Sequence, residues 1–572
     1  MFSDKALPEK PGVGAEKWTG PRLCRSPDRS ILAWKPIPPL WYNSARVSIT
    51  IPQPPAVPMI RVYNTLSKSK EPFEPVQPGK VGIYLCGPTV YKPSHIGHMV
   101  GPVIFDTIKR YLVYNGFDVT LVVNVTDVDD KLIAESNARK MSMAELADAM
   151  TADYMENIRS LGGDTIDHFP RCTENIDEII AFTAKLIAKD CAYQSDGDVY
   201  FDVSKDPDYG KLSHRSLEAM QGEGGGMAER KRNAADFALW KRAKPGEPSW
   251  PSPWGAGRPG WHIECSAMSR RILGTTFDIH GGGLDLVFPH HENEIAQSEC
   301  CHGRPMAKYW LHNGLMQASD EVGKVGGRHT RPEAGDLAAQ EAGKISKSKG
   351  SSAFRELLKE FSPETIRFFL LSTQYRRPID YSMSRIRAVE TGLETFYRFF
   401  QRYRRVSGES FYDIVPAARR SEGDFDPAGD LLLSDVAQRR ARFLDAMDDD
   451  FNTGGAIGDL FELVRRLNKA VDDDKLEEPA SRTPAKLAAL RRGAAALREL
   501  GATLGLFRQP VEAKAAAADS LTAPLMSLLI QLRAEARKRK DFATADTIRK
   551  GLLELGITLE DRPGGTEWKK EG

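Results

Sequence analysis

The sequence predicts an α/β protein of several domains, with an open parallel sheet, an insertion within it and a helical carboxyl-terminal half. Three observations support this fold class. The chain has 572 residues, several times the usual domain of about 100 to 200 residues. A strand, helix, strand pattern fills 81–125, and helical periodicity dominates after Lys344. A strand, a helix and a strand within about 45 residues predict a parallel crossover unit. Ligands of such open sheets bind at the carboxyl ends of the strands.

Composition excludes several classes of protein. The 79 Lys and Arg residues balance 78 Asp and Glu residues, so any contact with nucleic acid must come from local patches. A mean hydropathy of −0.41 and the lack of an apolar run of about 18 residues predict no membrane contact. Seven cysteines without a C-x-x-C pair indicate a reducing compartment, which we expect to be the cytoplasm.

Residues 1–58 differ from the rest of the chain because they hold 11 of its 36 prolines and show no helical or strand period. The pattern predicts a disordered extension. A targeting segment and a start codon assigned too far upstream are the two alternatives. The upstream start codon is suggested by Met59, which directly precedes the first strand-like segment, Ile60 to Asn64. A secretory signal is disfavoured because Pro36, Pro38 and Pro39 interrupt the apolar stretch Ile31–Trp41.

The amino-terminal α/β half is expected to begin with that strand and to build its sheet from segments on both sides of an insertion. The segment Val81–Cys86 predicts a strand, Gly97–Tyr114 a helix and Val119–Val125 a second buried strand. Strand-like texture returns after an insertion between Met141 and Pro259, at Thr276–His280 and Trp310–Met316.

The carboxyl-terminal half predicts helices to the end of the chain. Asn452 and Thr453 are suitable caps for a helix with apolar residues at Ile457, Leu460 and Leu467. The segment Ala485–Leu506 continues this bundle. Near the end, 531–540 carries five basic residues against one acid, which indicates either a solvated helix face or a surface that binds RNA.

The motif His95-Ile-Gly97-His98 stands at the start of the first predicted helix, just after a predicted strand. A helix amino terminus presents free N–H groups and a positive dipole end, so this position favours a polyphosphate site. Two histidines with this spacing are more often ordinary surface or packing residues. The position after a buried strand reverses that preference.

A lysine-rich segment, Lys344-Ile-Ser-Lys347-Ser-Lys349, precedes an amphipathic helix. A mobile loop of this kind can close over phosphates and neutralise charge that develops in a transition state. A solvated basic loop is the alternative.

A third group of residues has the chemistry of metal ligands. His290 and Glu294 lie four residues apart, so they share one helical face, and Cys86 and Cys265 could complete a tetrahedral zinc site. Cysteine is also common as a small buried apolar residue, so spacing alone does not select these two of the seven.

Together these motifs resemble the cysteinyl-tRNA synthetases, a family of class I aminoacyl-tRNA synthetases. The resemblance covers nearly all of the chain from Met59 onward and is most specific in seven segments: Tyr84–Tyr91, Asn124–Lys131, Asp236–Lys241, Gly260–Met268, Asp278–Gly283, Ala446–Asn452 and Lys540–Asp546.

The resemblance implies the roles of particular residues. The zinc ligands of one ion per chain would be Cys86, Cys265, His290 and Glu294. The residues implied for ATP and catalysis are His95, Gly97, His98, Asp285, Lys344 and Lys347, with Mg²⁺ accompanying the ATP. Those implied for binding L-cysteine are Gly87, Thr126, Trp261 and His280.

The resemblance also implies an activity: L-cysteine is activated with ATP and then transferred to tRNA-Cys, by an enzyme that we expect to be a monomer. The implied organisation is a Rossmann-like catalytic domain followed by regions that bind tRNA. Its expected parts are an extension (1–58), a first catalytic half (59–160), a connective insertion (161–235), a second catalytic half (236–316), a stem-contact region with the lysine loop (317–385), a helical anticodon-binding bundle (386–510) and a small tRNA-binding unit (511–572).

Two other functions are possible on this sequence. A ligase that joins cysteine to an amino sugar in thiol biosynthesis would share the catalytic half but lack the long helical tail. A catalytically inactive paralogue that binds RNA would have no use for intact His95, His98, Lys344 and Lys347. The sequence departs from the family at Ile345 and Lys349, and in a long insertion at 317–342 that has no functional interpretation.

Overall fold

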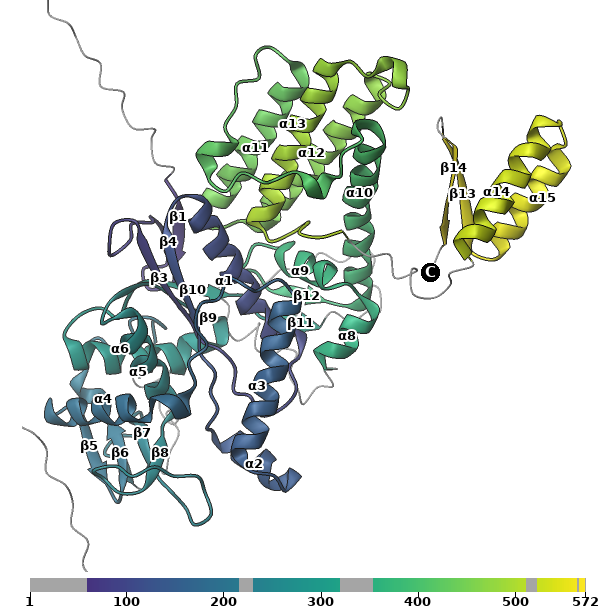
Figure 1. The fold of residues 1–572 in the computed structure, drawn as a ribbon. Helices are drawn as coiled ribbons and strands as arrows, with labels where there is room; N and C mark the ends of the chain where they lie inside the picture. The colour runs from purple at the N-terminus through teal and green to yellow at the C-terminus, as the bar shows by residue number, and fades with distance from the viewer. Residues whose placement is uncertain (1–58, 216–229, 319–352, 511–521, 563–564, 571–572) are drawn as a thin grey trace, which may run out of the picture. The chain divides into compact units, whose positions relative to one another are not determined.

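The computed structural model describes residues 59–215, 230–318, 353–510, 522–562 and 565–570. Its central element is a parallel sheet of four strands in the order β10-β9-β3-β4 (Figure 1). The strands are β3 (Lys80–Leu85), β4 (Asp118–Val123), β9 (Phe277–Gly283) and β10 (Ala307–Asn313). The predicted parallel crossover is therefore confirmed, with helix α1 (Ile96–Tyr114) joining β3 to β4.

The order of the strands creates a switch point between β3 and β9. The chain leaves β3 for β4 on one side and later returns to place β9 on the other side of β3. Crossovers that diverge in this way leave a crevice beyond the carboxyl ends of the two strands, where ligands bind in open α/β sheets. Cys86 follows β3 directly, and its N–H donates to Gly281 O at 3.0 Å.

The two faces of the sheet are covered by different helices, and the alternation of buried residues shows which. Ile83 and Leu85 of β3 pack in one apolar core with α1. Tyr84 points to the opposite face and packs with Cys265 and Met268 of α5 (Trp261–Leu273). Because successive side chains of a strand point to opposite faces, β3 contacts both layers.

The predicted insertion between the halves of the sheet is present and has its own sheet, but this sheet extends to Pro259 and does not end at residue 235 as expected. It combines α4 (Ile176–Ala188) with the antiparallel strands β5 (Ala192–Ser195), β6 (Asp198–Phe201), β7 (Phe237–Arg242) and β8 (Gly257–Pro259). Helices α2 (Asp130–Arg139) and α3 (Met143–Ser160) precede it, and α3 packs with α1 instead. The apolar core of the insertion includes Ile263 and Ala267 of α5. Helix α5 is thus packed between the insertion and the parallel sheet.

Two short sheets and a helix complete the catalytic half. Strand β1 (Arg61–Asn64) pairs with β2 (Ser69–Pro72), and β11 (Met316–Ala318) pairs with β12 (Ile379–Tyr381). Helix α6 (Glu292–His302) lies against α5, where Ser266 Oγ donates to Gln297 Oε1 at 2.8 Å.

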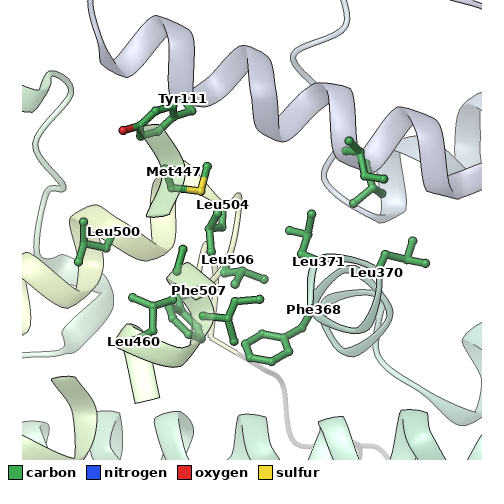
Figure 2. Packing of buried hydrophobic residues seen from close by; sticks show 14 of the residues in the cluster. Tyr111, Phe368, Leu370, Leu371, Met447, Leu460, Leu500, Leu504, Leu506 and Phe507 are labelled. Carbon is green, nitrogen blue, oxygen red and sulfur yellow. The ribbon is translucent and has the colours of Figure 1, made fainter. Parts of the chain in front are cut away.

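The helices after residue 352 share a core with α1. They are α8 (Phe354–Glu360), α9 (Pro363–Leu371), α10 (Met383–Ser407), α11 (Leu431–Asp448), α12 (Thr453–Asp473) and α13 (Pro484–Thr503). The expected cap is present, since Asn452 Oδ1 accepts from Gly455 N at 3.2 Å. Figure 2 shows Tyr111 of α1 beside Met447 of α11, in the same cluster as Leu504 and Phe368. The bundle and the sheet therefore bury one continuous apolar core.

The prediction that the chain is helical to its end is wrong. After α14 (Thr522–Lys538) and α15 (Phe542–Glu554), strands β13 (Ile557–Arg562) and β14 (Gly565–Lys570) form an antiparallel hairpin. Leu559 pairs with Trp568 and packs with Met526 and Leu552 in a small separate core. Charged residues make up half of each strand, so no apolar period revealed them in the sequence.

Among the described residues, no helix combines the length and the apolar character required to cross a membrane.

Candidate active site

A cavity of about 420 Å³ opens at the switch point, beyond the carboxyl ends of β3, β9 and β10 and beside the start of α1. Seven of the residues predicted from the sequence line it: Cys86, Gly87, His95, Gly97, His98, Trp261 and Asp285. The fold therefore brings together the predicted polyphosphate motif and the first predicted metal ligand. Lys344 and Lys347 lie outside the described residues.

The two histidines of the polyphosphate motif cap α1. His95 is the residue before the first turn, and its Nδ1 accepts from Gly97 N at 3.1 Å. His98 Nδ1 accepts from His95 N at 3.4 Å, and the two rings stack with centroids 3.8 Å apart. A Cβ at Gly97 would lie 2.9 Å from the His95 ring, so any other residue would displace that ring from the cap. This reciprocal cap fixes both imidazoles at the positive end of the helix dipole.

Four segments bring potential metal ligands together beside the cavity, and Cys86 is the one that lines it. Cys86 follows β3, Cys265 lies on α5, His290 lies in the turn Val287–His291 and Glu294 lies in the first turn of α6. Cys86 Sγ is 3.7 Å from Cys265 Sγ and 3.4 Å from Glu294 Oε1. Glu294 Oε1 is also 3.0 Å from His290 Nε2. These four residues, predicted as ligands, converge on one point.

A second possible ligand set overlaps the first. Cys86, His280, His291 and Glu294 also bring one ligand atom each to within 4.8 Å of one another. Both sets contain Cys86 and Glu294, so together they describe a position for a single ion with a choice of partners. Glu294 Oε2 and His291 Nε2 are buried and have no hydrogen-bond partner among the described residues. Buried polar atoms are normally bonded, so this cluster can hold a metal ion.

Charge in the cluster is distributed unevenly. Burial raises the pKa of Glu294, but the neighbouring His280 and His290 outweigh it and hold that pKa well below its usual range. Burial lowers the pKa of His290, yet Glu294 and Cys265 raise it overall. In the absence of a metal ion, a proton on His290 therefore balances the carboxylate. A divalent cation would fill the same electrostatic role.

A layer of histidines that the sequence analysis did not identify surrounds the cluster. His262 Nδ1 lies 3.0 Å from His290 Nδ1, and His291 Nδ1 lies 2.8 Å from His312 Nε2. Burial lowers the pKa of His262, His291 and His312 well below the usual value, so these rings are neutral. Hydrogen bonds of this kind orient metal-binding side chains. The adjacent pair His290-His291 is a signal that could have indicated His291, but not His262 or His312.

Two residues implied for cysteine binding do not line the cavity. Thr126 is buried and donates from Oγ1 to Glu264 Oε2 at 3.0 Å. His280 is fully buried, stacks on Tyr84 and lies 3.6 Å from Cys86 Sγ. His280 therefore lies behind Cys86, and Thr126 lies behind Thr89, with which it forms a β-bridge.

The other two residues of that group are accessible from the cavity. Gly87 N donates to Asn124 Oδ1 at 2.8 Å, and a Cβ at Gly87 would lie 1.8 Å from Asn124 O. Trp261 is 40% exposed, and its ring centroid is 4.4 Å from that of His290. Gly87 thus brings bare backbone to the cavity wall, and Trp261 places an aromatic face over a ligand of the cluster.

Three family profiles match consecutive parts of the chain. Residues 72–324 match the tRNA synthetases class I (C) catalytic domain, 442–508 the DALR domain and 521–568 the Cysteinyl-tRNA ligase anticodon binding domain. Among solved structures, a Mycobacterium tuberculosis methionyl-tRNA synthetase in complex with methionyl-adenylate is 15% identical with a TM-score of 0.53. That match covers 74% of this chain and 90% of the other, and it confirms the class I fold.

Curated relatives match over almost their whole length. A Cysteine--tRNA ligase of Heliobacterium modesticaldum is 46% identical over 517 residues, which cover 89% of this chain and 99% of that protein. A Cysteine--tRNA ligase of Thermococcus onnurineus is 43% identical, with the same coverage of both chains. With this identity, this coverage and the class I fold around the cavity, the chain belongs to the cysteinyl-tRNA synthetase family.

Proposed function

We propose that this chain activates L-cysteine with ATP in the cavity beyond β3 and β9, and then transfers the cysteinyl group to the 3′ end of tRNA-Cys. One observation carries the proposal. A buried cluster of two thiols, an imidazole and a carboxylate reaches, through Cys86, a cavity whose rim is the capped amino terminus of α1. The cluster suits a thiol substrate, and the rim suits a triphosphate.

The reaction needs no nucleophile from the protein. The carboxylate of cysteine attacks the α-phosphorus of ATP, pyrophosphate leaves, and a hydroxyl of the terminal tRNA adenosine later takes the acyl group. His95, His98 and the positive end of the α1 dipole hold the phosphates, and Asp285, which lines the same cavity, binds the ribose hydroxyls. Catalysis then depends on positioning and on stabilising charge that develops in the transition state. The roles of Lys344 and Lys347 stay predictions.

The distances in the cluster fit zinc. Two sulfurs bound tetrahedrally at about 2.3 Å from zinc lie about 3.8 Å apart. The two sulfurs of Cys86 and Cys265 are 3.7 Å apart. Zinc supplies a soft Lewis acid that prefers the sulfur of cysteine to the oxygen of serine, a distinction that packing alone makes poorly. Cys86, Cys265, His290 and Glu294 would hold this one ion.

Mg²⁺ is proposed to enter with the phosphates of ATP. Among the described residues that line the cavity, Asp285 is the one carboxylate, and it is assigned to the ribose. No residue of the chain is therefore assigned to magnesium.

The tRNA is proposed to contact the carboxyl-terminal half. Residues 521–568, which match an anticodon binding domain, have their own small core of Met526, Leu552 and Leu559. A cut after Gly408 would expose the core that α11 to α13 share with α1, whereas a cut after Pro510 spares it. We expect truncation after Pro510 to preserve amino-acid activation and to reduce aminoacylation at subsaturating tRNA. Equal aminoacylation by both forms would refute an RNA-binding tail.

The proposal includes a monomeric enzyme in a reducing, cytoplasmic compartment. The six described cysteines are all free thiols, as they would be in such a compartment. Size-exclusion chromatography with light scattering tests the oligomeric state.

Pyrophosphate exchange with each of the twenty amino acids tests the activity directly. We expect cysteine to support exchange and serine to fail, because serine lacks the sulfur that the cluster recognises. Exchange that requires no cysteine would refute the function. The amino-sugar ligase is disfavoured because the chain covers 99% of two cysteine--tRNA ligases and matches an anticodon binding domain. An inactive paralogue is disfavoured by the intact cap of His95 and His98.

A further inference from the structure

Asn313 is a buried polar residue of the cavity that has no assigned role. It ends strand β10 and its side chain lines the cavity, although only 5% of the residue is exposed. Its Nδ2 donates to Gly314 O at 3.1 Å, while Oδ1 has no hydrogen-bond partner among the described residues. A buried carbonyl oxygen without a donor is unfavourable, so water or a ligand that enters the cavity is expected to supply one.

The surroundings of Asn313 leave room for a ligand. Asn313 pairs in register with Gly283 of β9, two residues before Asp285. Across from it lies Gly101 of α1, where a Cβ would stand 3.7 Å from Asn313 Oδ1. Glycine at this position keeps the space beside the oxygen open. Asn313 therefore lies between the first turns of α1 and the strand that leads to Asp285.

We propose that Asn313 Oδ1 accepts a hydrogen bond from the adenosine part of ATP. This inference rests on the proposed ATP site. The triphosphate of ATP offers acceptors only, whereas adenosine offers its 6-amino group and its ribose hydroxyls as donors. Asp285, the candidate ligand of the ribose, lines the same cavity. A neutral acceptor opposite a donor group fits adenosine better than any other part of the nucleotide.

The ammonium group of cysteine is the competing donor, and the sheet places it elsewhere. Tyr309 and Leu311 alternate with Asn313 along β10 and pack on the α1 face. The metal cluster involves α5 and α6 on the other face. In addition, β9 separates β10 from β3, so the strand ends that carry Asn313 and Cys86 are about 10 Å apart. An ammonium three bonds from a sulfur held at the cluster does not span that distance.

The test measures cysteine-dependent pyrophosphate exchange with Asn313→Ala and with Asn313→Leu, which fills a similar volume. Loss of one neutral hydrogen bond should raise the KM for ATP by about 3- to 10-fold and leave the KM for cysteine unchanged. The matched control is Asn175→Ala. Asn175 is equally buried but is bonded on both sides, donating to Arg171 O and accepting from Arg271, each at 2.7 Å, and it does not line the cavity.

ATP analogues identify the donor. Purine riboside triphosphate lacks the 6-amino group, and 2′-deoxy-ATP and 3′-deoxy-ATP each lack one ribose hydroxyl. We expect one of these analogues to bind the unaltered protein as weakly as ATP binds Asn313→Ala. The affinity of that analogue should not fall further when Asn313 is replaced. If no analogue is weakened in the unaltered protein, the proposal is overturned even where the variants fail to fold.

Two further results separate this inference from the proposed function. An Asn313 variant that changes only the KM for cysteine would overturn the inference and assign the oxygen to the ammonium group. If the unaltered protein shows no cysteine-dependent exchange, the proposed function fails first. ATP binding to the full chain and to Asn313→Ala, measured by calorimetry, then decides the inference separately, and equal affinities would refute it.

Discussion

Two regions of this molecule bury charged groups, and they do so in different ways. In the metal cluster, Cys86, Glu294 and His291 point ligand atoms at one another, and two of these atoms have no hydrogen-bond partner among the described residues. Between α1 and α9, the guanidinium of Arg367 is also fully buried, but the protein satisfies each of its nitrogens.

The second region is an ion pair that joins the sheet to the helical bundle. Arg367 Nη2 donates to Asp106 Oδ2 at 2.6 Å and to Thr107 Oγ1 at 3.0 Å, both on α1. Its Nε donates to Leu504 O after α13, and its Nη1 donates to Leu161 O after α3. One side chain thus connects four segments that are distant in the sequence.

The difference teaches how to separate a functional cluster from a structural one. Both regions pay the desolvation penalty of buried charge. Where protein oxygens accept from every nitrogen of a buried charged group, as at Arg367, that group stabilises one arrangement of the chain. Where potential metal ligands converge and some of their atoms lack a hydrogen bond, the remaining interaction is left for a ligand. Three changes test this distinction, from the largest expected effect to the smallest.

The largest effect is expected from Cys265→Ser. The change removes a soft ligand, so the protein should lose its zinc and at least about 100-fold of its cysteine-dependent exchange. Metal content measured by mass spectrometry, together with the exchange rate, checks this. Cys301→Ser is the matched control because Cys301 is as buried but lies outside the cluster.

The alternative ligand set gives this prediction a sharper form. We expect His290→Ala to lose the metal and His291→Ala to retain more of it. If His291→Ala loses the metal while His290→Ala and Cys265→Ser keep it, the ion is held by Cys86, His280, His291 and Glu294 instead.

Arg367→Met is expected to reduce stability rather than chemistry. It leaves Asp106 buried without its main partner, which costs about 3 to 5 kcal/mol in the free energy of unfolding. Urea denaturation measures this loss. Exchange per folded molecule should stay within about twofold of the unaltered protein, because Arg367 does not line the cavity. A large loss of exchange in the folded variant would contradict the distinction between the two regions. Adding Asp106→Asn should recover part of the stability.

The smallest effect concerns pH. Burial raises the pKa of Asp106, but Arg367 and Arg110 outweigh it and lower the pKa overall. The carboxylate therefore stabilises the fold above its unfolded pKa of about 3.9, and this contribution is lost as pH falls toward the lower folded value. The difference in unfolding free energy between the unaltered protein and Asp106→Asn should be constant above about pH 5 and shrink below about pH 4. A difference that grows on acidification would show that the pair does not act this way.

Several features follow from the sequence because they depend on local spacing. The period of apolar residues predicts β3, α1 and β4 to within two residues at each end. The sequence also predicts the cap at Asn452, because its side chain accepts a hydrogen bond from a backbone N–H only three residues later. The motif at His95 and His98 forms its reciprocal cap within four residues.

Both the sequence and the structure were needed to identify the metal cluster. Spacing placed His290 and Glu294 on one face, but the resemblance to a family was needed to choose Cys86 and Cys265. The structure then showed that four separate segments converge on one point. It also added the neutral rings of His262 and His312, which no local pattern connects to the cluster.

By itself, the sequence determined the elements whose periodicity is local: the strands and helices of the sheet, the caps and the motifs at their ends. The tertiary structure alone decided the buried partner of Arg367, the positions of Thr126 and His280 behind the cavity wall, the free oxygen of Asn313 and the hairpin after α15. These depend on contacts between residues that are far apart in the chain. Such contacts are chosen by packing and by the need to satisfy buried polar groups, neither of which leaves a period in the sequence.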